Sequence, residues 1–216
     1  MTRFRLMLVG LAISLTASPL MPARGASPPI PVLFLGDRGH HEPADRAAQI
    51  KPVLALRGID VTYTENLADL NPETLAKYRA LVVYANIDEI APAQEEALLD
   101  YVEGGGGFVP IHCASYCFRN SPRCVALVGA QFKSHGAGEF DTTVVDAEHP
   151  ITEGLHPFRT WDETYVHDHH NADARHVLQK RGDEPTLGPG RMARAAFSTP
   201  PTGTTRGPGN SRVFRT

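Results

Sequence analysis

The sequence has little excess charge of either sign and no basic stripe. Its 216 residues include 21 Lys and Arg against 24 Asp and Glu, which gives a formal net charge of −3. Nucleic-acid-binding domains gather Lys and Arg on one face or along one helix. The balance of charge therefore argues against nucleic acid as a partner.

Two common ligand-binding patterns are also missing. Nucleotide-binding glycine loops follow a strand and open a helix, whereas Gly104–Gly107 precedes an apolar segment. The scarce cysteines, Cys113, Cys117 and Cys124, do not have the spacing of a zinc motif. In an oxidising compartment they could form one disulfide and leave one thiol, and their spacing does not select the pair.

The apolar run near the N-terminus, Leu6–Ala17, is too short to span a bilayer. Basic residues precede it, and Ala23 and Gly25 provide small residues for a cleavage site. We therefore expect residues 1–25 to be a secretory signal peptide, with a periplasmic or secreted mature protein and no stable membrane insertion after cleavage. An uncleaved anchor or a misassigned start codon is the alternative.

Residues 30–111 alternate between strand-like and helix-like segments, which predicts a parallel sheet covered on both faces. A helix starting at Pro43 should bury Ala47, Ile50, Val53, Leu54 and Leu56, with a kink or break at Pro52. A second helix should start at Asn71–Glu73, and a third should cover Pro92–Glu103. The expected strands are Ile30–Leu35, Ile59–Tyr63, Ala80–Tyr84 and a buried Phe108–Ile111.

The pattern changes after Ser115. We expect a short helix within Phe118–Val128, a loop over Gly129–Gly136, and strands over Glu139–Val145 and His176–Gln179. The pair His112–Cys113 lies just before this part of the chain, where the strand that follows the glycines should end. Ligands bind at the carboxyl ends of strands in open α/β sheets, so this pair is the first place to look for chemistry.

Several short motifs, in order and spacing, resemble those of the ThuA-like (trehalose utilisation) family, which has the class I glutamine amidotransferase-like fold. The resemblance runs from Pro31 to about Pro185 and implies a flavodoxin-like three-layer α/β sandwich with a mostly parallel sheet, over a domain of residues 30–185, and a role with small-molecule carbohydrates. The motifs are Gly39-His40-His41, the run from Gly105 to Ser115, Phe132–Gly136, His149-Pro150 and Asp162–His167.

The last part of the chain departs from that family. Residues 186–216 are rich in Gly, Pro, Arg and Thr without apolar periodicity, so we expect a disordered or out-of-frame tail and a C-terminally incomplete sandwich. The family leads us to expect a strand with a His-Asp pair here. When such a strand is back-translated with GC-rich codons and the reading frame is moved by one nucleotide, the translation matches Ala195–Arg206. We therefore hypothesise a frameshift that starts just after Pro185.

Three functional interpretations stay open. In the first, imidazoles and a carboxylate on loops along one rim act as general acid and base on a sugar hydroxyl, or hold a divalent metal. In the second, Cys113 is a nucleophile at a strand-to-helix elbow, although Ala114 replaces the usual glycine. In the third, the protein binds sugar without turnover, with aromatic rings such as Tyr84 stacking on it. The predicted catalytic residues are His112, Glu163, His167 and Cys113, and the predicted substrate-binding residues are His40, His41, His135, Trp161 and Tyr165.

Overall fold

The centre of the protein is a four-stranded parallel sheet with the order β2-β1-β3-β4. The computed structural model describes residues 27–188; the expected signal peptide and the segment Ala195–Arg206 lie outside the described residues. The strands are β1 (Ile30–Leu35), β2 (Ile59–Thr64), β3 (Ala80–Val83) and β4 (Gly107–Pro110). This strand order is that of the flavodoxin-like doubly wound fold.

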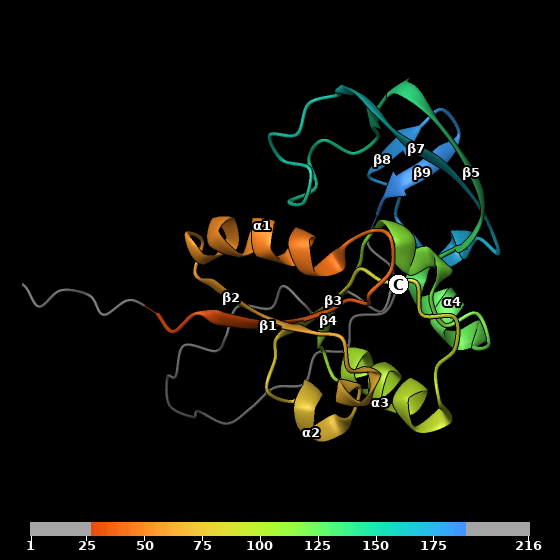
Figure 1. Cartoon of the computed structure of the whole chain (residues 1–216). Coiled ribbons are helices and arrows are strands. Elements are labelled where there is room, and N and C mark those ends of the chain that lie inside the picture. The colour runs from red at the N-terminus through yellow and green to blue at the C-terminus, as the bar shows by residue number, and fades with distance from the viewer. Residues whose placement is uncertain (1–26, 189–216) are drawn as a thin grey trace, which may run out of the picture.

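Helices cover both faces of this sheet, which makes three layers (Figure 1). Helix α1 (Pro43–Ala55) lies on one face, and α2 (Pro72–Leu75) and α3 (Pro92–Glu103) lie on the other. The expected flavodoxin-like three-layer α/β sandwich is therefore confirmed. No helix in the described part of the chain is long and apolar enough to cross a membrane.

Alternate residues of β1 supply the two halves of the core. Val32 and Phe34 pack with Ala47 of α1, whereas Leu33 and Leu35 pack with the residues of α3. Successive side chains of a strand point to opposite faces, so a strand that is apolar throughout can serve both layers. This is why β1 reads as a continuous hydrophobic run.

Prolines and glycines set the helix boundaries where the sequence predicted them. Helix α3 begins with Pro92, and Gly105 follows its end with a φ of 95°, a conformation that a residue with a side chain adopts at a cost. Asn71 caps α2 because its side-chain oxygen accepts a hydrogen bond from the backbone N–H of Thr74 (2.9 Å).

Helix α1 corrects two expectations. It continues through Pro52 to Ala55, so the proline does not break it. Val53 and Leu56 do not belong to its buried side: Leu56 is 90% exposed. The buried stripe follows Pro43, Ala47, Ile50 and Leu54. At 3.6 residues per turn Val53 lies about a quarter turn from this stripe, and Leu56, just after the helix, lies nearly opposite it.

Strand β4 is less buried than predicted because it lies at the edge of the sheet that the described residues form. Val109 is 44% exposed, and Ile111, which follows the strand, is also exposed. Within residues 27–188, β4 pairs with one neighbour only, β3. Its apolar composition alone did not reveal this position.

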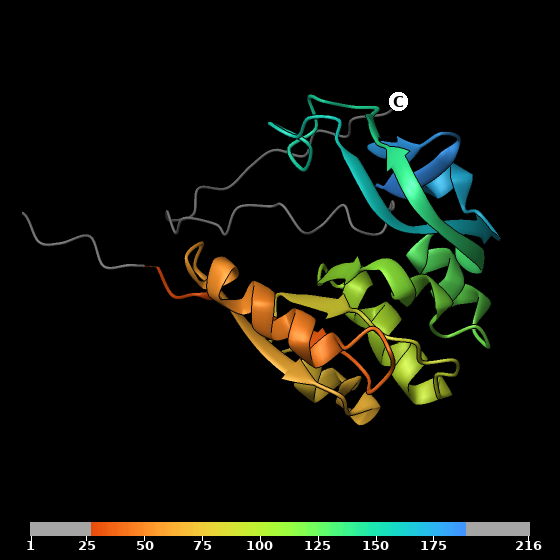
Figure 2. The ribbon, with the colours of Figure 1, turned by 45° about the horizontal axis from the view of Figure 1, so that its top comes forward.

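The second half of the chain contributes antiparallel strands that stand beside the parallel sheet (Figure 2). Strands β5 (Gln131–Asp141) and β7 (Arg159–Asp168) form a two-stranded ribbon. A small sheet consists of β6 (Thr143–Val144), β8 (Gln179–Arg181) and β9 (Glu184–Leu187), in that order. The ribbon contacts η2 (His112–Tyr116), the short 3-10 helix that follows β4, and lies next to α4 (Pro122–Val128).

Three predictions for this half were wrong in their boundaries. Most of the expected loop over Gly129–Gly136 belongs to β5, whose residues are largely exposed and so lack a clear apolar alternation. The expected strand Glu139–Val145 is divided between β5 and β6 (Thr143–Val144) at Thr142. The expected strand His176–Gln179 overlaps β8 (Gln179–Arg181) only at Gln179. The last described strand, β9 (Glu184–Leu187), pairs with β8.

Candidate functional site

The backbone of His112 adopts a left-handed conformation at the carboxyl end of β4. Its φ is 50°, which is unusual for a residue with a side chain and costs on the order of 1–3 kcal/mol. His112 also begins η2, so the chain turns sharply here. Such a conformation persists only where the surrounding contacts hold it, and it directs attention to what the imidazole touches.

The loop after β1 brings a second imidazole to His112. The ring centroids of His41 and His112 are 4.8 Å apart in an edge-to-face arrangement. His40, which is exposed, packs against His41 with a centroid distance of 4.1 Å. The ring centroid of Tyr84, the residue after β3, lies 6.0 Å from the ring centroids of both His41 and His112. Three strand ends of the parallel sheet therefore meet at this point.

Strand β7 supplies the carboxylate. The Glu163 Oε2 lies 3.0 Å from His112 Nε2, and Tyr165, two residues along the same strand, stacks on the His112 ring at 4.4 Å. Residues two apart share a face of a strand, which explains why both reach the same imidazole. On the partner strand, His135 Nδ1 lies 3.7 Å from Glu163 Oε1.

Strand β7 and its partner β5 also show where the prediction of loops was wrong. His135, Glu163 and His167 belong to the ribbon β5–β7 and not to loops. The predicted convergence nevertheless occurs, because the register places His135 opposite Tyr165. The described structure therefore brings His40, His41, His112, His135, Glu163 and Tyr165 together in one group.

Burial controls the charge of the two central imidazoles. Desolvation lowers the pKa of His112, against the opposing effect of Glu163 and Asp162. Desolvation also lowers the pKa of His41, and the neighbouring His112 and His40 add to that effect. Both imidazoles are therefore neutral near pH 7, the form that accepts a proton or binds a metal ion. Burial beside Glu163 raises the pKa of Tyr165.

The carboxylate has an unused acceptor. Glu163 Oε2 is shielded from solvent and receives no well-aligned hydrogen bond from the described residues, although His112 Nε2 is close. A shielded polar atom without a partner is unfavourable. A ligand hydroxyl or a cation at this position would satisfy it.

His41, His112 and Glu163 also have the donor chemistry of a metal site. One ligand atom from each lies within 4.8 Å of the other two. Two imidazoles and a carboxylate are a known zinc ligand set, and bonds of 2.0–2.1 Å in a tetrahedral site place ligand atoms about 3.4 Å apart. Small rotations of the three side chains would therefore be needed to close around an ion.

His167 lies next to this group but has different partners. Its ring centroid is 5.9 Å from that of Tyr165. Its Nδ1 lies 2.6 Å from Glu184 Oε1 and its Nε2 lies 3.2 Å from Ser115 Oγ. Neither Ser115 nor Glu184 was among the predicted site residues. Ser115 ends the matched glycine-rich motif, whereas no sequence pattern around Glu184 marks it.

The buried Cys113 thiol is poorly suited to be a nucleophile. Its exposed fraction is 0%, and burial raises its pKa to about 12. The attacking species of a cysteine enzyme is the thiolate, which this environment strongly disfavours. Cys113, Cys117 and Cys124 are all free in the structure, so no disulfide joins any two of them.

Trp161 presents an aromatic surface to solvent. It is 67% exposed and lies two residues before Glu163 on β7, so it faces the same side of the strand. It does not belong to the core. Its exposure leaves its ring available to a ligand that reaches Glu163.

Four further histidines have their partners outside this group. His176 Nε2 pairs with Asp146 Oδ2 at 3.0 Å, and the ring of His149 is 5.7 Å from that of His176. His169 pairs with the adjacent Asp168. His170 contacts the backbone carbonyl of His167 with its Nε2 (3.1 Å). These contacts are those of surface residues.

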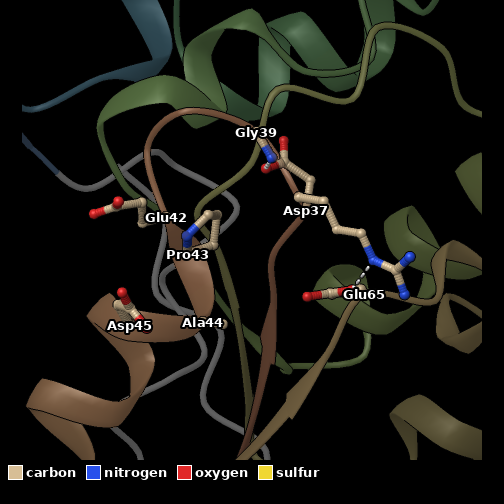
Figure 3. Close-up of a pocket in the computed structure, with 8 residues that line it drawn as sticks. Asp37, Gly39, Glu42, Pro43, Ala44, Asp45 and Glu65 are labelled. Atoms are coloured by element: carbon tan, nitrogen blue, oxygen red, sulfur yellow. Dashed lines mark hydrogen bonds and ion pairs between the residues drawn. The ribbon is translucent and has the colours of Figure 1, made fainter.

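A separate hollow of about 230 Å³ lies between the loop after β1 and the start of α1 (Figure 3). Asp37, Glu42, Asp45 and Glu65 are among its lining residues, and the ion pair between Arg38 Nε and Glu65 Oε2 (2.7 Å) crosses one side of it. None of the three central residues His41, His112 and Glu163 lines it. We assign it no chemistry.

The strand order and the three layers define a flavodoxin-like α/β protein, with a histidine group at the carboxyl ends of its strands. The chain belongs to the ThuA family, described as trehalose utilisation, whose family model matches residues 31–216. No curated protein matches the chain at a significant level.

Two solved structures of ThuA-like proteins share the fold. The one from Bacteroides uniformis has a TM-score of 0.62 at 23% identity and covers 74% of this chain and 71% of its own. The one from Parabacteroides merdae has a TM-score of 0.60 at 19% identity, with coverages of 71% and 68%. At these identities the likeness concerns the fold alone.

Proposed function

We propose that this protein acts on or binds a carbohydrate at the group formed by His41, His112 and Glu163. The observation that carries the proposal is the 3.0 Å approach of a half-buried imidazole, His112, to a shielded oxygen of Glu163 that has no hydrogen-bond partner in the described part of the chain. The family description, trehalose utilisation, supports a sugar as the ligand class.

The charge states of the group suit proton transfer on a sugar. His112, neutral because burial lowers its pKa, can accept the proton of a sugar hydroxyl, and Glu163 would stabilise the imidazolium that forms. On a hemiacetal, removal of the O1 proton forms the C1 carbonyl while the bond from C1 to the ring oxygen breaks. The ring oxygen then takes a proton from water or a neighbouring imidazole, so the step is balanced.

Aromatic rings on two sides of the group favour a sugar over a smaller ligand. Tyr165 stacks on His112, and Trp161 is exposed further along β7. Aromatic side chains bind sugars through the apolar face of the ring while hydroxyls reach polar groups. Trp161 also supports the second candidate function, binding without turnover.

The test uses the full chain with trehalose and glucose as probes. Glucose has a hemiacetal and trehalose has none, so the pair separates binding from hemiacetal chemistry. We expect a rise in Tm with at least one of the two sugars, lost in His112→Asn and kept in the control His176→Asn, which changes a surface imidazole.

The rate at which the α and β anomers of glucose interconvert, measured by NMR at the anomeric carbon, reports turnover. Faster exchange of glucose than in buffer, lost in His112→Asn, supports catalysis. Binding without faster exchange supports the sugar-binding module instead. No binding of either sugar by a folded wild-type chain would contradict both forms of the proposal.

The same three side chains should hold a divalent cation when one is supplied. Because His41 and His112 are neutral and Glu163 is an acceptor, we expect Zn²⁺ to raise Tm in the wild type and much less in Glu163→Gln. An equal rise in both proteins would place the ion elsewhere.

A further inference from the structure

Ser115, His167 and Glu184 form a hydrogen-bonded chain of three side chains. Ser115 Oγ lies 3.2 Å from His167 Nε2, and His167 Nδ1 lies 2.6 Å from Glu184 Oε1. The side chains of His167 and Glu184 are each only 16% exposed. A hydroxyl, an imidazole and a carboxylate in this order are the arrangement that activates a serine nucleophile.

The partners of His167 determine its useful tautomer. Glu184, as a carboxylate, can only accept, so the hydrogen of neutral His167 lies on Nδ1. Its Nε2 is then free to accept a hydrogen from the Ser115 hydroxyl. That hydroxyl also lies 3.1 Å from the carbonyl oxygen of His112, and since it has one hydrogen it can donate to only one of the two at a time.

Three separate elements supply the chain. Ser115 lies in η2, His167 lies near the end of β7, and Glu184 begins β9. Ser115 is half-buried and therefore partly open to solvent, in contrast to the neighbouring Cys113. The hydroxyl two residues along η2, and not the thiol, has a base within reach.

We infer that Ser115, His167 and Glu184 form a serine-nucleophile centre that hydrolyses acyl esters. Ser115 Oγ attacks the ester carbonyl carbon while its proton passes to His167 Nε2. The bond from that carbon to the alkoxy oxygen breaks, and the departing oxygen takes the proton from His167 and leaves as an alcohol. Water then attacks the acyl-serine with His167 as base, which releases the carboxylic acid and restores the Ser115 hydroxyl.

This inference is independent of the proposed sugar chemistry, which depends on His41, His112 and Glu163. The alternative is structural: the three side chains would only tie the small sheet and the ribbon to η2. A structural tie forms no covalent adduct, so a reagent that traps activated serines distinguishes the two.

The test is covalent labelling of the full chain with a fluorophosphonate, in which the serine oxygen displaces fluoride. We expect a single adduct on Ser115, located by peptide mass spectrometry. Ser115→Ala should lose it, and the control Ser134→Ala, which changes an exposed serine of β5, should keep it.

The contributions of the other two residues follow from their roles. His167→Gln should slow labelling and the hydrolysis of p-nitrophenyl acetate by about 100-fold or more, the usual effect of losing a general base. Glu184→Gln should slow both while Tm and the sugar response stay near wild type. Ser115→Ala removes one hydroxyl group, so its melting curve shows whether the fold is intact.

Two results would overturn the inference. One is a folded wild-type chain that gives no adduct on Ser115 after prolonged exposure to the reagent. The other is ester hydrolysis that is unchanged in folded Ser115→Ala, because the activity would then come from another group. If His167→Gln unfolds, the labelling of Ser115 in wild type and in Glu184→Gln still distinguishes a serine-nucleophile centre from a structural tie.

Discussion

His112 Nε2 and Glu163 Oε2 approach to 3.0 Å, although one follows a strand of the parallel sheet and the other belongs to the antiparallel ribbon. Neither part of the fold contains the site alone. The left-handed backbone of His112 turns its chain at the end of β4, and the pairing of β5 with β7 sets the position of Glu163. Changes to either side chain should therefore be detected at the other.

The first prediction concerns the pKa of His112 when Glu163 is neutralised. Glu163 opposes the effect of burial, so Glu163→Gln should lower the pKa of His112 further below its ordinary value. The measurement is an NMR titration of the His112 ring resonance. Glu139→Gln, which removes an exposed carboxylate of β5 paired with Arg159, is the matched control and should leave the pKa unchanged. A rise in the His112 pKa in Glu163→Gln would be inconsistent with the contact.

The second prediction concerns stability against pH. The pKa values of His41 and His112 are lower in the folded protein than the ordinary 6.5. The unfolded chain therefore binds more protons as the pH falls below about 6.5, and stability falls with it. Above that pH the effect is absent. Asp37, Glu163 and Asp162 face these imidazoles and moderate the effect.

Urea unfolding at pH 7.5 and pH 5.5 measures this effect. The double variant His41→Asn/His112→Asn should lose less stability between the two pH values than the wild type does. A steeper loss in the variant would show that the two imidazoles are not buried as neutral groups.

The third prediction separates the Cys113 interpretation from the histidine site. Because burial raises the pKa of Cys113 and of Cys117 to about 12, a thiol reagent at pH 8 should react with the native chain slowly and with all three cysteines in guanidinium. Cys113→Ala should keep the response to sugar. Rapid stoichiometric modification of Cys113 in the native chain would contradict this prediction and support Cys113 as the nucleophile.

The fourth prediction compares a buried leucine with an exposed one. Leu98 of α3 is fully buried, whereas Leu56, just after α1, is 90% exposed. Leu98→Ala should lower the free energy of unfolding by about 2–5 kcal/mol, and Leu56→Ala should change it by less than about 0.5 kcal/mol. Denaturant unfolding of both variants gives the comparison. A large effect of Leu56→Ala would place that residue in a contact outside the described part of the chain.

The parallel half of the fold could be predicted because local signals coincide with element ends. Pro92 opens α3 and the glycines after Glu103 close it. The apolar strand β1 is buried on both faces, and β3 is buried on one face and partly buried on the other. Most of the ribbon β5–β7 gave no such signal, and only its segment Glu139–Asp141 was expected to be a strand. Its stability depends on pairing between distant segments, and its exposed residues follow no apolar alternation.

The site was predictable for a similar reason and to a similar extent. His41 and His112 follow strands whose carboxyl ends meet in a parallel sheet, so their convergence follows from topology. Ser115 and Glu184 were missed because their connection passes through His167 in the ribbon. Only the tertiary pairing reveals which acceptor each nitrogen of that imidazole contacts.

The most direct test of the central claim is the NMR titration of the His112 ring resonance with trehalose and with glucose in the wild-type chain. We predict a saturable shift of this resonance with at least one sugar, together with a smaller shift of His41 and none of His176. A chain that binds sugar while the His112 resonance stays unchanged, or that binds neither sugar, would contradict the account.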